Sequence, residues 1–243
     1  MTFEVRSAPN AKTKAAVRNV YLFDNGNLID FKNGDSGKFE FAIDMKHYAD
    51  TIWNSAGRSS KKAVLDSYPH LFTVAVQDEK GNVAYTPVFP VICDMGASRP
   101  YKGILPTVPG TIDTTKFDEG GNGAATYKQK RRGGTYEVGR EGMFSRKALN
   151  LREAGEWANF SFKNGKAGKF DIVLKRGKYR MEWPLRALVL IDGIYVGDFL
   201  AKEHAGTAVI KGIRLPAGNH RLTLISACAY GVWPTSLEFT AAK

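Results

Sequence analysis

Cysteine is scarce in this 243-residue chain, which contains only Cys93 and Cys228. The two lie in strand-like runs of different predicted modules, so neither a disulfide framework nor a cysteine-based metal knuckle is expected. The sequence predicts two buried free thiols instead. Long apolar runs are also missing, because the longest, 187–191, is far too short to cross a bilayer. The charged opening residues lack the apolar core of a signal peptide, so no targeting segment is expected.

Residue patterns typical of catalysis are missing as well. No serine occupies a nucleophile elbow, and no metalloprotease spacing occurs among the four histidines, His47, His70, His204 and His220. Glu153 and Glu156 are the closest carboxylates of the second predicted module, but nothing pairs two acids across a cleft, as glycoside hydrolysis requires. The sequence contains no phosphate loop, dinucleotide fingerprint or zinc spacing. We therefore expect no enzymatic activity, no cofactor and no metal.

The residues that are abundant favour β-structure. Apolar residues make up 43% of the chain, enough for a packed core, and aromatic residues make up 12%. Twenty-five glycines accompany short β-branched runs, a composition typical of many strands joined by tight turns. The chain length fits one large or two ordinary domains, and the sequence predicts an all-β protein.

The positive charge is unevenly distributed along the chain. The net charge is +11, of which residues 1–104 contribute 13 − 11 = +2 and residues 105–243 contribute 22 − 13 = +9. An excess of positive charge indicates which partners could bind and says little about the fold. It is compatible with an acidic glycan, nucleic acid, an acidic protein surface, or no specific partner.

The first 95 residues predict a flexible arm and one domain. Residues 1–16 are polar without periodicity and predict a flexible arm or an attachment strand. From residue 17 onward, strand-like runs alternate with turn residues, and we expect strands at 17–23, 28–31, 38–43, 71–76 and 83–92. Pro87 and Pro90 confine the last of these to a sheet edge. Residues 45–67 break the pattern and predict one short helix or a long loop.

Two hairpin motifs carry a family resemblance for residues 17–95. The segments VRNVYLFDNGN (17–27) and FTVAVQDEKGN (72–82) resemble bacterial immunoglobulin-like spacer domains. This resemblance implies an immunoglobulin-like β-sandwich that spaces and docks other domains. Residues 96–110 contain Pro100, Pro106 and Pro109 and predict a semi-rigid linker.

Residues 111–243 show even spacing of strand-like runs and turns, which is typical of a sandwich or barrel. Motifs in this region occur in the same order as in carbohydrate-binding modules of family six: PGTIDTTKFDEGGNG (109–123), GGTY (133–136), AGEWANFSF (154–162), VLIDGIYVG (189–197), LPAGNHRL (215–222) and SLEF (236–239). The module therefore resembles that family, and the resemblance implies a jelly-roll β-sandwich. It also implies that Trp157 is a core residue and that Glu156 is structural.

The resemblance to family six also implies where a sugar would bind. Family members hold a sugar between two loop aromatics, and Tyr136 stands at one of these positions. The second aromatic is missing; His204 is the nearest candidate, and Tyr230 with Trp233 offers a replacement platform. Two of these residues have a purely structural alternative: Tyr136 as a half-buried loop tyrosine, and Trp233 as a packed residue.

Other expected family ligands are replaced. The acidic residues of the family's calcium site align with Thr115, Lys116 and Thr235, so no bound calcium is expected. A basic run on a predicted loop is either a solvated face or a contact for phosphate or an anionic glycan; its members are Lys128, Lys130, Arg131 and Arg132.

Two functions remain open. In the first, the chain is a non-catalytic structural or decorating protein of a phage virion or cell-surface appendage, working with protein partners or as a homo-oligomer. In the second, it is a secreted glycan-binding accessory module of a polysaccharide-degrading system and acts outside the cell. The missing signal peptide, the lost calcium ligands and the incomplete aromatic clamp favour the first reading.

Overall fold

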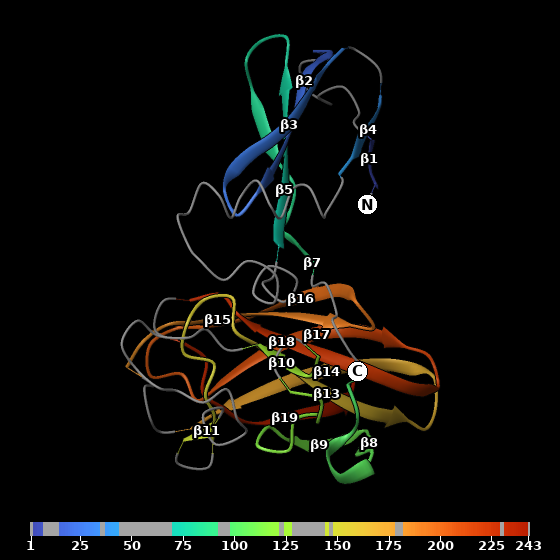
Figure 1. Ribbon diagram of the computed structural model, residues 1–243, viewed down its shortest axis with the longest axis vertical. Coiled ribbons are helices and arrows are strands. Elements are labelled where there is room, and N and C mark those ends of the chain that lie inside the picture. The colour runs from blue at the N-terminus through green and yellow to red at the C-terminus, as the bar shows by residue number, and fades with distance from the viewer. Residues whose placement is uncertain are drawn as a thin grey trace. The chain divides into compact units, whose positions relative to one another are not determined.

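The computed structural model describes residues 2–6, 15–34, 37–43, 70–91, 98–121, 124–127, 144–145, 148–177, 182–228 and 231–242 (Figure 1). The described residues up to 91 form one compact unit, and those from 98 onward form a second. Apart from one 3-10 turn, Tyr101–Gly103, the regular structure of the described residues consists of β-strands. None of these residues forms a helix long and apolar enough to span a membrane. The all-β prediction is therefore confirmed.

The first unit contains two antiparallel sheets. The larger has the order β3-β2-β5-β6 with β7 also paired to β5, and the smaller pairs β1 with β4. The strands are β1 (Thr2–Arg6), β2 (Val17–Asp24), β3 (Asn27–Asn33), β4 (Lys38–Ala42), β5 (His70–Asp78), β6 (Val83–Tyr85) and β7 (Phe89–Val91).

Alternating side chains place one core between the two sheets of the first unit. Val20 and Leu22 on β2, Phe72 on β5 and Phe41 on β4 are all fully buried, and they belong to one apolar cluster. Because successive side chains of a strand point to opposite faces, their neighbours Tyr21 and Asn19 turn to the other face of the larger sheet. The two sheets thus form a small sandwich, while the immunoglobulin-like assignment stays a prediction.

Turn chemistry sets the hairpins of this unit. Asn25 and Gly26 have φ of 49° and 81°, the left-handed pair that a two-residue hairpin turn requires. After β5, the carboxylate of Asp78 accepts hydrogen bonds from the main-chain N–H groups of Lys80 and Asn82, both at 2.9 Å. The Asn82 side chain, which donates to Asp78 Oδ2 at 2.8 Å, does most to hold the pKa of Asp78 below its ordinary value, and the two main-chain bonds act in the same direction.

Of the two alternatives predicted for residues 1–16, a flexible arm or an attachment strand, the structure shows a strand at residues 2–6; residues 7–14 lie outside the described residues. Thr2–Arg6 form β1 and pair with β4, with Val5 opposite Phe39, so these residues are a strand rather than a flexible arm. Phe3 and Val5 pack against the core, and burying these apolar side chains offsets the loss of conformational freedom. The predicted helix or loop at 45–67 lies outside the described residues.

The second unit is a larger two-sheet sandwich. One sheet has the order β10-β13-β18-β15-β16 with β8 also paired to β13, and the other has the order β17-β14-β19-β9. The strands are β8 (Thr107–Val108), β9 (Gly110–Asp113), β10 (Thr126–Tyr127), β11 (Phe144–Ser145), β12 (Ala148–Leu149), β13 (Trp157–Asn164), β14 (Gly168–Arg176), β15 (Leu185–Ile191), β16 (Ile194–Ala201), β17 (Thr207–Leu215), β18 (Gly218–Ser226) and β19 (Pro234–Ala241).

The chain of the second unit crosses between its sheets at nearly every connection from β13 to β19. Such crossing is the arrangement of a jelly-roll sandwich. The two sheets enclose one apolar core that includes Phe160, Phe162, Leu224 and Phe239. Trp157 is 1% exposed, so its predicted core position is confirmed.

The predicted linker 96–110 differs from the structure. Arg99 forms a β-bridge with Glu119, and β8 pairs in parallel with β13, so residues from 99 onward are built into the second unit. Proline interrupts regular strands, and in this stretch the prolines separate short paired segments instead of forming an unpaired linker. Cys228 is a free, half-buried thiol, and Cys93 lies outside the described residues.

Candidate functional site

Three loops of the second unit meet where the four-stranded sheet ends. The main-chain N–H of Arg176, the last residue of β14, donates to Gly206 O at 2.8 Å. The N–H of Gly177 donates to Trp233 O at 3.1 Å on the other side. The loop before β17, the segment before β19 and the loop after β14 therefore lie together, and we name this place the Arg176 end.

The guanidinium of Arg176 joins two of these loops. Its Nη1 donates to Ala205 O at 3.2 Å and to Lys202 O at 3.4 Å, while its Nη2 donates to Trp183 O at 2.8 Å. Burial lowers the pKa of Arg176 from its ordinary value, and the nearby Cys228 and Glu182 act in the opposite direction. The group stays charged at physiological pH, because the ordinary pKa of a guanidinium is above 12. One cation thus fixes the main chain of both loops.

Trp183 is an aromatic residue of the Arg176 end that the sequence analysis missed. Its side chain is half-buried, and its carbonyl is held by Arg176. The available signal was local: a tryptophan followed by Pro184, in a break between two strand-like runs. The family pattern places its second aromatic in the loop before β17, so it gives no indication of an aromatic in this neighbouring loop.

Two sequence-predicted residues lie at the Arg176 end, on opposite sides of β14. His204 is exposed at the tip of the 202–206 loop, with φ of 60°. Trp233 lies on the opposite side of β14 and is only 7% exposed, so its indole as placed offers little surface for stacking. Tyr136 and Tyr230 lie outside the described residues, as does the basic run Lys128, Lys130, Arg131 and Arg132.

A close backbone approach holds the Trp233 segment. Leu151 and Val232 form a β-bridge with N–H···O distances of 3.0 and 2.7 Å. Gly231, with φ of 78°, lies against this contact, and a Cβ atom there would come within 2.6 Å of Arg152 Cα. Only glycine fits both the positive φ and the space. The segment next to Trp233 is therefore fixed by its main chain.

The residues at the family's calcium positions bind one another or nearby main chain. Lys116 Nζ lies 3.6 Å from Asp113 Oδ2, and Thr115 Oγ1 donates to Asp113 Oδ1 at 2.7 Å. Thr235 Oγ1 donates to Lys175 O at 3.2 Å. In the part of the chain that the structure describes, no three His, Cys, Asp or Glu side chains are grouped to hold a metal ion. The expectation that calcium is not bound stays a prediction.

Of the two carboxylates considered for acid–base chemistry, Glu156 is bonded within a loop and Glu153 lies on the surface. Glu156 is 1% exposed, and its Oε2 accepts from the N–H groups of Arg152 at 2.7 Å and Glu153 at 3.3 Å. Glu153 lies on the surface beside Arg152, with a separation of 3.9 Å between side-chain atoms. Glu156 thus closes the loop before β13 rather than facing a cleft.

Comparisons with known proteins give structural similarity at low sequence identity. No protein-family profile matches the chain, and no curated protein matches it. Among solved structures, a carbohydrate-binding module CBM36 in complex with calcium and xylotriose is 12% identical, with a TM-score of 0.37, over 54% of this chain and 98% of that one.

Two further solved structures show the same level of similarity. A CBM35 in complex with a glucuronic acid containing disaccharide is 14% identical, with a TM-score of 0.35, over 55% of this chain and 94% of that one. A ruminal GH26 endo-beta-1,4-mannanase is also 14% identical, with a TM-score of 0.37, over 58% of this chain and 27% of the enzyme. At these values, the assignment to a sandwich rests on the strand order described above, and membership of family six stays a prediction.

Proposed function

We propose that the chain is a non-catalytic glycan-binding module and that the Arg176 end of its second unit holds the sugar. The observation that carries this proposal is the set of bonds from Arg176 to the carbonyls of Trp183, Lys202 and Ala205. They bring a half-buried tryptophan ring and an exposed histidine into loops with a fixed main chain. Loops positioned by a rigid sandwich are where binding residues concentrate.

The chemistry of these side chains suits a carbohydrate. The face of an indole ring is apolar and packs against the C–H face of a pyranose, while its N–H remains a hydrogen-bond donor. His204 adds a donor or acceptor for hydroxyl groups. Because the loops are fixed before binding, little conformational entropy is lost when the sugar docks. In this proposal, Trp183 supplies the second stacking aromatic, for which the loop before β17 offers no tryptophan.

Glycan binding replaces the virion role as the first proposal. No observation on the described residues favours a place in a capsid, tail or appendage, whereas the contacts of Arg176 support a binding role for the loops that carry Trp183 and His204. We further propose that the module works outside the cell beside a polysaccharide-degrading enzyme. The +9 charge of residues 105–243 makes acidic sugars the first class to test.

The experiment is a glycan-array screen of the full chain, followed by calorimetric titration of the best ligand. Trp183→Ala and His204→Ala should weaken binding, with about tenfold loss for the tryptophan because a stacking ring is removed. Ile194→Ala is the matched control, since Ile194 is 69% exposed and lies at the opposite end of β15 from the Arg176 end. Equal affinity in all three variants would refute this site.

Salt dependence tests the acidic-sugar part of the proposal separately. If the basic run contacts an anionic glycan, binding should weaken steeply with salt, because the contacts release counterions. Replacing Lys130, Arg131 and Arg132 together by Gln should reduce that slope. An unchanged slope would assign the anion to other cations of the chain or show that the glycan is neutral.

A further inference from the structure

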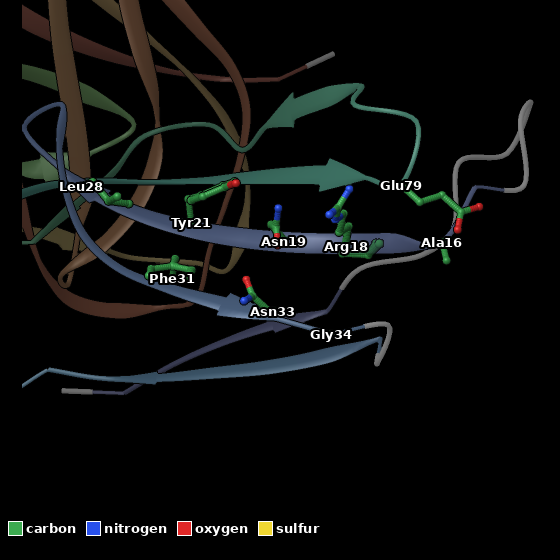
Figure 2. A pocket seen from close by; sticks show the side chains of 10 residues that line it. Ala16, Arg18, Asn19, Tyr21, Leu28, Phe31, Asn33, Gly34 and Glu79 are labelled. Atoms are coloured by element: carbon green, nitrogen blue, oxygen red, sulfur yellow. The ribbon is translucent and has the colours of Figure 1, made fainter.

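A groove of about 660 Å³ lies on the outer face of the larger sheet in the first unit, away from the core. Figure 2 shows Tyr21 and Asn19 along β2, with Phe31 and Asn33 on the neighbouring β3. The volume is within the range of small-molecule sites. The lining residues come from β2, β3 and the turns beside them, with Glu79 after β5. We name the whole outer face of the sheet β3-β2-β5-β6, which includes this groove, the outer groove.

Three aromatic side chains lie in one row across the outer groove, which is interrupted on β5 by the buried Ala75. Phe31 is opposite Tyr21, Tyr21 is opposite Ala75, and Ala75 is opposite Tyr85 in the strand register. Directly opposed residues of antiparallel strands point to the same face. Phe31 is 52% exposed and Tyr85 69% exposed. With neighbouring strands ~4.8 Å apart, this row spans roughly 14 Å, a length suited to an oligosaccharide.

Amide side chains form a second row, two residues further along each strand. Asn33 is opposite Asn19, and Asn19 is opposite Gln77. Gln77 Oε1 accepts from Asn19 Nδ2 at 2.9 Å and from the Tyr21 hydroxyl at 3.1 Å. Among the described residues, no partner occupies Gln77 Nε2 or the side chain of Asn33. The amide row therefore presents both donors and acceptors roughly 7 Å from the rings.

We propose that the outer groove is a second carbohydrate-binding surface, which takes a neutral oligosaccharide. Sugar rings stack on Phe31, Tyr21 and Tyr85, and their hydroxyl groups bond to the amide row. The charged residues that line the groove are Arg18 and Glu79, one of each sign, so the charge favours no ionic ligand. The inference goes beyond the function proposed above, because it uses no residue of the second unit.

The paired rows distinguish this surface from an ordinary protein-docking face. A protein partner is recognised by an apolar centre surrounded by a polar rim. Here, amide side chains lie beside the rings of Phe31 and Tyr21 on β3 and β2, and the amide row continues to Gln77 on β5; on β6, Val83 is opposite Gln77 and the amide row ends. Amides donate and accept at once, which matches a hydroxyl group and costs no buried charge. The test below distinguishes sugar binding from the docking of a second copy of the chain on this face.

The test uses the full chain with cellotetraose, xylotetraose, mannotetraose and maltotetraose as neutral probes. Binding is measured by calorimetry at about 0.05 and 0.5 M salt, and the site by hydroxyl-radical footprinting. We expect a probe to protect Phe31 and Tyr85, with an affinity that salt leaves unchanged. Phe31→Ala should weaken this binding about tenfold, and Asn33→Ala should weaken it several-fold.

Phe89→Ala is the matched control for Phe31→Ala. Phe89 is also an exposed phenylalanine of the first unit, but it is opposite the core residue Phe72 and therefore belongs to the other face of the sheet. Its replacement should leave affinity unchanged, and Trp183→Ala should not affect footprinting at Phe31. Thermal unfolding of each variant checks that the fold is retained.

Three results would overturn the inference. Binding that depends on Trp183 and not on Phe31 would sustain the function proposed for the Arg176 end while removing the outer groove. Phe31 protected before any sugar is added would show that the surface is already covered, by the chain itself in a monomer or by a second copy in a dimer. Protection by none of the four probes would exclude neutral oligosaccharides from the outer groove, whatever the Arg176 end binds.

Discussion

His220 Nδ1 lies 2.7 Å from Asp192 Oδ2, and His220 Nε2 lies 3.0 Å from Pro216 O. Both ring nitrogens therefore face acceptors, an arrangement that favours the doubly protonated imidazolium. Burial alone would lower the pKa of His220, but the Asp192 carboxylate and the Pro216 carbonyl outweigh it and raise that pKa above its ordinary value of 6.5.

This contact predicts a pH-dependent difference between the wild type and Asp192→Asn. A raised pKa in the folded state gives stability that is fully present below pH 6.5 and is lost as pH rises through the folded pKa. The variant keeps the left-handed turn that Asp192 occupies, because asparagine tolerates positive φ. The gap in unfolding free energy should be larger at about pH 5.5 than at about pH 9. A gap independent of pH would contradict this assignment.

Tyr195 should ionise only in strongly alkaline solution. Burial of the phenol, followed by its hydrogen bond to Asp198, raises the pKa of Tyr195 to about 12. Arg186 binds the same carboxylate through Nε at 3.0 Å and Nη2 at 2.9 Å. Tyrosinate absorbance should therefore show a step near pH 12 that disappears in Tyr195→Phe. In Asp198→Asn this step should move toward pH 10. Because the chain has ten tyrosines, the test is the difference from wild type, and a Tyr195→Phe variant that loses absorbance change near pH 10 instead of near pH 12 would refute the prediction.

Removing divalent cations should leave the second unit unchanged. Lys116 places an ammonium beside Asp113, and Thr115 donates to the same carboxylate through its main-chain N–H and its hydroxyl group. A bound ion would raise the melting temperature by mass action, so a chelator should shift that temperature by less than about 1 °C. Calorimetric melting with and without chelator, and with added calcium, measures the effect. A fall of several degrees would show that an ion is held.

Glu156→Gln should destabilise the second unit without affecting ligand binding. Glutamine can keep one oxygen toward these N–H groups but is neutral, so both bonds lose the negative charge of their acceptor, and weakening bonds to a buried charged group costs about 1–3 kcal/mol. Urea unfolding gives the free energy, and Glu153→Gln is the matched control, since its side chain is 37% exposed. Equal stability of both variants would mean that Glu156 does not hold the loop.

Local chemistry explains why much of the fold was predictable from the sequence. The turns at Asn25–Gly26 and Asp192–Gly193 require residues that accept positive φ, and both pairs are visible in the sequence beside alternating apolar residues. The core position of Trp157 followed from the family motif. The pairing of Thr2–Arg6 with β4 was not predictable, because it depends on a partner more than thirty residues away along the chain.

The Arg176 end was only partly predictable for a similar reason. His204 and Trp233 were identified from motif positions, whereas the role of Trp183 depends on a guanidinium that reaches a carbonyl 26 residues away as well as one seven residues away. Neither distance appears as a sequence pattern. The rows of the outer groove depend in turn on strand register, which a hairpin motif specifies only for adjacent strands.

The bonds from Arg176 end on main-chain carbonyl oxygens, so they are indifferent to which side chains the two loops carry. Residues 202–206 and the stretch around Trp183 are therefore free to diversify in sequence while the sandwich keeps presenting them at the same place. For protein engineering, this makes the second unit a scaffold on which these two loops are exchangeable. In evolution, the same contacts allow related chains to change both loops by substitution alone, provided that the arginine is kept.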